Sequence, residues 1–313
     1  MHEKTHYLDY VNIQQGTDST WRFSRGNTLP LTQLPYGMAA FAPQCTGMET
    51  WWYSPHSRVV EGIRLTHQPS PWIGDYGTIM FTPQADAFLD KFYEAWTGMR
   101  PRDTVLRPDY LKLGFARSCA TAEVAPLKRG AKVRMCYETD MPACVSFYNM
   151  KGNGAFELDA AANELRGWTD GYAQGKAKDF KMFVTVRPQG DWVDWDASRI
   201  GDEKGAFVHL VLKPGCHVAE FTLGISYISY DFARRNVAAD LSRSLEEIRA
   251  EAEARNLTVG MMLDMRSNPR IYTALEAIRG GAVGKISNVC FEGQHPLMYG
   301  SRAGWYFEDG KHG

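Results

Sequence analysis

Between residues 111 and 229 the chain is divided into short apolar runs, and this pattern constrains the fold more than any other feature. The runs cover residues 111–121, 132–138, 143–149, 180–187, 206–212 and 217–229. Turns rich in glycine, proline and asparagine separate them, as in Lys213-Pro214-Gly215. Runs of this length between such turns are typical of β-strands. Many short strands at this spacing predict an antiparallel β-sandwich.

The first hundred residues carry the same signal less regularly. Residues 35–43 and 77–83 are apolar and are bounded by turn residues, so we expect two buried strands there. The fold class is therefore expected to be mainly β over residues 1–230.

The pattern changes at Tyr230. Residues 231–256 are rich in alanine, glutamate and arginine at helical spacing, and Ser242 with Leu245 and Glu246 indicates a second helix start. Further along, 257–263 and 285–292 resemble strands, and 269–279 resembles a helix. This alternation differs in class from the sandwich. We expect a sandwich at 1–230, a helical joint at 231–245 and a short, truncated α/β segment at 246–313.

Charge and cysteine content narrow the functional classes. The net charge is −1, from 35 basic and 36 acidic residues, so no global field points to nucleic acid. There is neither an apolar run long enough to span a membrane nor an apolar signal region at the N-terminus, so we expect a cytoplasmic protein. The six cysteines form no C-x-x-C pair. Free thiols are therefore expected, which suits a reducing compartment.

The loop between residues 65 and 77 gathers the strongest candidates for ligand contact. Its polar and aromatic residues are Thr66, His67, Gln68, Trp72 and Asp75. A sugar site needs hydrogen-bonding groups on rigid loops together with an aromatic platform. Two prolines stiffen this loop, because proline restricts both itself and its predecessor. The alternative is that His67 and Asp75 only close the loop by hydrogen bonds.

Two further groups are candidates for the same kind of site. Trp51 and Trp52 form a second aromatic platform or else fill the core. Gly16, followed by Thr17, would let the backbone approach a ligand closely. None of these residues is a metal ligand, and no metal site is expected in this chain.

Several motifs occur in an order that resembles the N-terminal domain of glycoside hydrolase family 92. They are Gly16-Thr17, Leu34-Pro35-Tyr36-Gly37-Met38, Leu65-Thr66-His67 and Gly74-Asp75-Tyr76-Gly77. The resemblance covers about residues 8–240 and implies a supersandwich of the galactose-mutarotase type. The family consists of calcium-dependent exo-acting α-mannosidases in which a separate helical barrel supplies the acid, the base and the calcium ligands. The resemblance therefore implies a mannose-containing glycan as partner and calcium only with that further domain.

The chain departs from the family pattern at two places on the sugar-binding side. Thr66-His67 is followed by Gln68-Pro69-Ser70-Pro71 instead of a turn rich in serine and glycine. Gly16-Thr17 is followed by Asp18-Ser19 instead of a glycine pair. Both departures bear on which glycosidic linkage is preferred.

No catalytic residue can be nominated. Hydrolysis of a glycosidic bond needs two carboxylates on opposite sides of the bond. Glu61 and Asp75 flank the loop, but the sequence does not place them across a ligand. The sequence thus leaves open whether this chain is itself an enzyme.

Residues 244–264, with Asn268-Pro269, Gly284-Lys285-Ile286 and Gly293-Gln294-His295-Pro296, resemble a fragment of the Gfo/Idh/MocA oxidoreductase family. A fragment of such an oxidoreductase is the alternative function. No G-x-G-x-x-G follows a strand, so NAD(P) binding is not expected. The joint near residue 240 is either a genuine gene fusion or an artefact of sequence assembly. A truncated segment would expose apolar faces, so association through it is expected.

Overall fold

The computed structural model describes residues 8, 11–19, 26–45, 53–70, 75–171, 180–201, 207–254, 276 and 280–281. The chain divides into two compact units, Met1–Thr258 and Val259–Gly313. Nearly all described residues belong to the first unit. The expected strands at 257–263 and 285–292 and most of the helix expected at 269–279 lie outside the described residues, so the α/β segment and its resemblance stay predictions.

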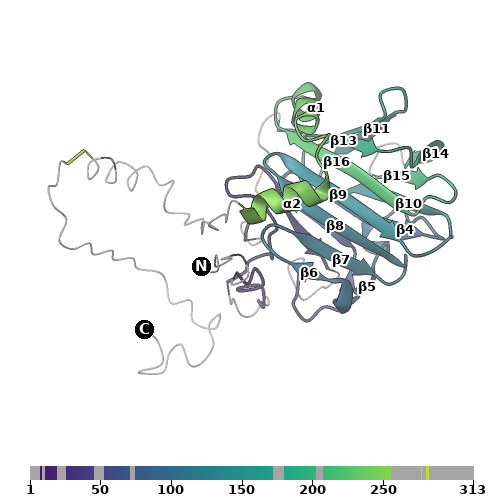
Figure 1. The fold of residues 1–313 in the computed structure, drawn as a ribbon. Helices are drawn as coiled ribbons and strands as arrows, with labels where there is room; N and C mark the ends of the chain where they lie inside the picture. Colours follow the sequence, from purple (N-terminus) through teal and green to yellow (C-terminus); the bar gives the residue numbers. More distant parts are fainter. Residues whose placement is uncertain are drawn as a thin grey trace. The chain divides into compact units, whose positions relative to one another are not determined.

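Two antiparallel sheets form the first unit (Figure 1). The six-stranded sheet has the order β1 (Ala40–Gln44), β3 (Gly62–Thr66), β4 (Ile79–Ala85), β10 (Ala143–Asn149), β15 (Phe207–Leu212) and β14 (Val193–Gly201). The eight-stranded sheet has the order β11 (Gly154–Asp159), β12 (Glu164–Thr169), β13 (Met182–Gln189), β16 (Val218–Ser226), β9 (Gly130–Tyr137), β8 (Ala120–Leu127), β7 (Leu111–Phe115) and β6 (Val105–Leu106). The remaining short elements are the strand pair β2 (Val59–Val60) with β5 (Thr97–Gly98) and the 3-10 helices η3 (Phe92–Glu94) and η4 (Pro101–Asp103).

The core lies between the two sheets. Phe81 of β4 and Phe147 of β10 meet Phe221 of β16, with ring centroids 6.0 Å and 5.5 Å away. All three rings are almost completely buried. Aromatic burial of this extent supplies much of the free energy that holds two sheets together. The predicted antiparallel β-sandwich is confirmed.

The strand predictions differ from the structure where the chain turns sharply. One strand was expected at 111–121, but β7 ends at Phe115 and β8 begins at Ala120. Between them the backbone of Cys119 has a φ of 45°, a left-handed conformation that no strand accommodates. Strands β3, β11, β12 and β14 and the two-residue strands β2, β5 and β6 were not expected. Of these, β6, β11 and β14 lie at the edges of the two large sheets, where the apolar signal is weak.

Helix α1 (Tyr230–Ala238) packs on β13 and β16 of the large sheet. It begins where the side chain of Ser229 accepts a hydrogen bond from the backbone N–H of Phe232, as expected of an N-cap residue. Neither α1 nor the second described helix has the length and apolar character needed to cross a bilayer.

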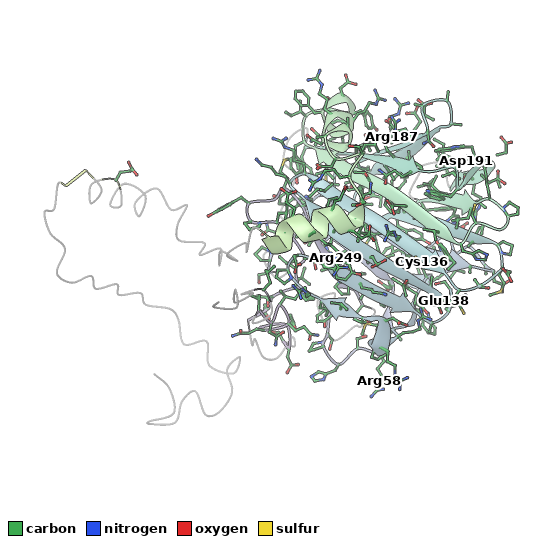
Figure 2. The ribbon with its side chains drawn as sticks, in the orientation of Figure 1. Arg58, Cys136, Glu138, Arg187, Asp191 and Arg249 are labelled. Atoms are coloured by element: carbon green, nitrogen blue, oxygen red, sulfur yellow. The ribbon has the colours of Figure 1, made fainter. Side chains whose placement is uncertain are left out.

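Helix α2 (Leu245–Ala254) packs on β8 and β9 of the same sheet (Figure 1). It begins with a reciprocal cap between Ser244 and Glu247, rather than at Ser242 as expected. Leu245 is buried in a hydrophobic cluster that also contains Tyr110. Arg249, which is labelled in Figure 2, lies 3.7 Å from the centre of the Tyr110 ring. The sandwich unit therefore includes α2, beyond the expected boundary at residue 245. Apolar burial against the sheet explains the difference.

The five described cysteines are free, as expected from their spacing. Cys45 and Cys144 are buried, and burial raises the pKa of their thiols to about 11 and about 12. Both groups are therefore protonated at neutral pH and are poor nucleophiles.

Candidate functional site

The carboxylate of Asp75 is the centre of the loop that the sequence singled out. Its Oδ2 atom accepts hydrogen bonds from Arg64 Nη2 at 2.8 Å and from Thr66 Oγ1 at 2.7 Å. Its Oδ1 atom accepts from the backbone N–H groups of His67 at 3.0 Å and Tyr76 at 2.8 Å. Four donors thus converge on one carboxylate and tie the two ends of the loop together. This closure is the structural role considered for Asp75 from the sequence.

The alternation of side chains along β3 explains why Arg64 and Thr66 both point at Asp75. Ile63 and Leu65 face the core, so Arg64 and Thr66 face the opposite side of the strand. The side chains of Arg64 and Asp75 are only 3% and 5% exposed. Burial lowers the pKa of Arg64, while the charge of Asp75 opposes that shift. The charge of Asp75 therefore helps the buried guanidinium of Arg64 to stay protonated.

The ring of His67 lies beside the hydrogen bonds to Asp75 and packs among aromatic side chains. The ring stacks on Tyr76 at 4.8 Å with an angle of 18°, and Tyr227 meets its edge at 5.6 Å. Phe180 completes the cluster, 5.7 Å from Tyr76 and 5.9 Å from Tyr227. His67 Nδ1 lies 2.7 Å from the carbonyl oxygen of Tyr76. Its Nε2 atom is buried and has no hydrogen-bond partner among the described residues.

Gly77 allows the chain to turn from the loop into strand β4. Its φ is +59°, and a Cβ atom there would lie 2.7 Å from Met182 Sδ and 3.4 Å from His67 Cε1. Any other residue would be strained and would push against the neighbours of the His67 ring. A glycine at this position therefore lets the aromatic cluster pack tightly around His67.

A second segment connects Gly16 to the loop. The backbone of Gly26 crosses Gly16 so closely that a Cβ on Gly26 would lie 2.7 Å from the Gly16 Cα. From there Leu29 N–H donates to Pro69 O at 2.9 Å, and Ser70 Oγ donates to Asn27 O at 2.7 Å. The candidates around Gly16 and those in the loop are therefore parts of one region.

The structure places the individual candidates differently. Thr17 is buried and donates through Oγ1 to Gln14 O at 2.7 Å, and Thr66 is committed to Asp75. Gln68 is half-buried, next to His67. Trp51, Trp52 and Trp72 lie outside the described residues. Ligand contact by all of these residues stays a prediction.

Sequence reasoning missed Arg64, Tyr227 and Phe180. The alternation of β3 could have pointed to Arg64, because a charged residue within a buried strand requires a partner. No local signal could have found Tyr227 or Phe180. Tyr227 follows β16 and Phe180 precedes β13, so both reach the loop only through the fold.

A separate polar cluster lies under the segment 86–96 on the small sheet. Ser146 Oγ is 2.7 Å from His209 Nδ1, and His209 Nε2 is 3.2 Å from Asp90 Oδ1. These are the residue types of a serine hydrolase triad. Ser146 is 0% exposed, however, and Gln84 Nε2 donates to its hydroxyl at 2.6 Å. The cavity beside Gln84 measures about 10 Å³, which is room for one water molecule and too small for a substrate. This cluster is therefore not a catalytic site, and it holds the segment 86–96 against the six-stranded sheet.

The described residues hold no group of three or more histidines, cysteines or acids that could bind a metal ion. The carboxylate of Asp75 is occupied by its four donors, and Glu61 is buried, which raises its pKa. Asp75 therefore has no oxygen to spare for a calcium ion. Glu61 Oε2 has no hydrogen-bond partner among the described residues, but one buried carboxylate falls far short of the six to eight oxygen ligands that calcium takes. The described part of the chain does not fit a calcium site, and the dependence of calcium on a further domain stays a prediction.

The model of the glycosyl hydrolase family 92 N-terminal domain matches residues 10–206. The chain belongs to this family. No curated protein sequence matches the chain. Among solved structures it is similar to an inverting mannosidase of family 92 from Bacteroides thetaiotaomicron, with 22% identity and a TM-score of 0.72 over 82% of this chain and 36% of that enzyme.

Two further family 92 structures share the fold. An α-mannosidase from the same bacterium has 19% identity and a TM-score of 0.64, over 81% of this chain and 38% of its own. Its complex with mannoimidazole gives 19% identity and a TM-score of 0.63, over 80% and 36%. The chain thus spans little more than a third of the length of these enzymes. At such identities the likeness shows the fold alone.

Proposed function

We propose that the sandwich of this family 92 member forms one wall of a binding site for a mannose-containing glycan. The catalytic acid and base would come from a further domain of an α-mannosidase-like glycoside hydrolase. The observation that carries the proposal is the closure of the loop on Asp75. A turn that only linked two strands would need no buried ion pair, whereas a recognition loop needs its contact groups held rigidly.

The chemistry around the loop supports a sugar as ligand. Its described residues include a histidine ring, two tyrosine rings and the amide of Gln68, and the charges of Arg64 and Asp75 are paired with each other. Sugars are bound by aromatic faces together with neutral hydrogen-bonding groups. The solved relatives are mannosidases, and one of them is in complex with mannoimidazole. Both facts favour a mannoside over an anionic ligand.

Titration calorimetry of the whole chain with methyl α-mannoside tests the proposal. We expect a dissociation constant in the millimolar range, because one wall of a site makes few contacts. His67→Ala should abolish the measurable heat. His217→Ala is the matched control, since His217 is a half-exposed histidine that pairs with Asp140 away from the loop. Absence of binding by the unaltered chain would refute the proposal, as would equal loss in both variants.

A further inference from the structure

The hydrogen bond at Nδ1 decides the protonation of His67. Nδ1 is 2.7 Å from the carbonyl oxygen of Tyr76, and a carbonyl oxygen can only accept. Nδ1 therefore carries a proton. Burial lowers the pKa of His67, and the nearby charge of Arg64 acts in the same direction, while Asp75 and the Tyr76 carbonyl oppose it. The ring is neutral at pH 7, so its second nitrogen, Nε2, has a free lone pair.

The free lone pair makes Nε2 a hydrogen-bond acceptor. It is buried and has no partner among the described residues. The buried hydroxyl of Tyr227, in the same aromatic cluster, also has no partner among the described residues. Buried polar atoms of native proteins are nearly always paired, so these two groups together call for a polar ligand. The rings of Tyr76 and Tyr227 pack against the His67 ring. A neutral hydroxyl group suits this position, whereas an anion has no proton to give.

Arg64 and Asp75 hold this arrangement without touching the ring. Asp75 Oδ1 binds the N–H groups of both His67 and Tyr76, so it fixes the separation between the ring and the Tyr76 carbonyl. Arg64 holds Asp75 through Nη2 and is itself held by Gln44 through Nη1 at 3.2 Å. Loss of this support would free Nδ1 from its acceptor and let the proton move to Nε2.

We propose that Arg64 and Asp75 are positioning residues that keep His67 in the tautomer with Nδ1 protonated. Nε2 is thereby presented as the acceptor for a hydroxyl group of the bound sugar. The hydroxyl part of this proposal rests on the proposed function, and the tautomer part does not.

Nitrogen-15 spectroscopy of the histidine rings in the whole chain tests the tautomer. The unaltered protein should show His67 with a protonated Nδ1 and an unprotonated Nε2 at pH 7. Asp75→Asn should give a mixture of tautomers, because its amide cannot accept from all four donors. Thr66→Val removes one donor only and serves if Asp75→Asn fails to fold. Glu164→Gln, a buried carboxylate held by Arg234 elsewhere, is the control and should leave the His67 signals unchanged.

The same samples titrated with methyl α-mannoside test the hydroxyl contact. We expect the Nε2 signal to shift on binding, and Asp75→Asn to weaken binding about tenfold. A proton on Nε2 in the unaltered protein, or the same tautomer in every variant, would overturn the positioning role. Sugar binding without a shift of Nε2 would overturn the contact and leave the proposed function standing. No binding at all would overturn both the contact and the proposed function, while the tautomer result would stand alone.

Discussion

Arg64 Nη2 lies 2.8 Å from Asp75 Oδ2, and both side chains are almost completely withdrawn from solvent. A buried ion pair of this kind contributes little net stability, because desolvation offsets the attraction between the charges. Its breakage is costly, however, since it leaves one charge buried without a partner. We therefore expect the loop to keep its closed conformation only while both charges of the pair are present.

The first prediction concerns this pair. Asp75→Ala should lower the free energy of unfolding by about 3–5 kcal/mol, because Arg64 would remain buried without its counter-charge. Urea unfolding measures the loss. Glu138→Ala is a suitable control, since Glu138 pairs with Arg100 at 2.8 Å but is 59% exposed. Its removal should change stability only slightly, and a comparable loss in both variants would contradict the buried role of Asp75.

Gly77 gives the second prediction. Gly77→Ala should destabilise the chain by more than Gly190→Ala, although both glycines have positive φ values, +59° and +77°. The left-handed backbone costs both variants roughly 1 kcal/mol. At Gly77 the new methyl group also lies 2.7 Å from Met182 Sδ, whereas at Gly190 nothing lies within 4 Å. Thermal unfolding of the two variants compares them, and equal midpoints would show that Met182 moves aside without cost.

The third prediction is a pH dependence from His209. Burial lowers its pKa from the ordinary 6.5 to about 4. The unfolded chain therefore binds a proton below pH 6.5 that the folded chain refuses until about pH 4, so stability falls as the pH falls through this window. The loss is on the order of 3 kcal/mol. Urea unfolding between pH 7 and pH 4 should show a shallower decline in His209→Gln, and an unchanged decline would mean that His209 is protonated in the fold.

The fourth prediction concerns α2. Leu245→Ala should lower the free energy of unfolding of the sandwich by about 2–5 kcal/mol, because Leu245 is fully buried against the large sheet. Ala250→Ser on the exposed side of the same helix should cost roughly 0.5 kcal/mol through helix propensity alone. The near-ultraviolet circular dichroism of the sandwich follows both variants. A sandwich that unfolds normally in Leu245→Ala would show that α2 is an independent element.

The sequence predicted the fold well where strands are fully buried. Strand β10 was expected at 143–149 and lies there, since nearly all of its residues are buried and most of them are apolar. Strand β14 was missed because it lies at a sheet edge, carries acidic and basic residues, and is interrupted by a shift of register between Asp194 and Arg199. An edge strand owes its place to backbone pairing more than to apolar burial, so its side chains give little signal.

The site could be predicted only in part for a related reason. His67 and Asp75 share a short, proline-stiffened loop, so local composition was enough to nominate them as candidates. Their support comes from Arg64, which depends on the orientation of β3, and from Tyr227, which lies more than 150 residues away in the chain. Contacts of the second kind are set by the fold and leave no trace in local spacing.

The alternation in β3 also acts as a check on folding. A slip of one residue in its pairing would exchange Ile63 and Leu65, which are fully buried in the core, with Arg64 and Thr66. A guanidinium group would then enter the apolar interior, and Asp75 would lose two of its donors at once. The side chains that hold the loop therefore also favour the correct register of β3. A slipped register would cost free energy on both faces of the strand.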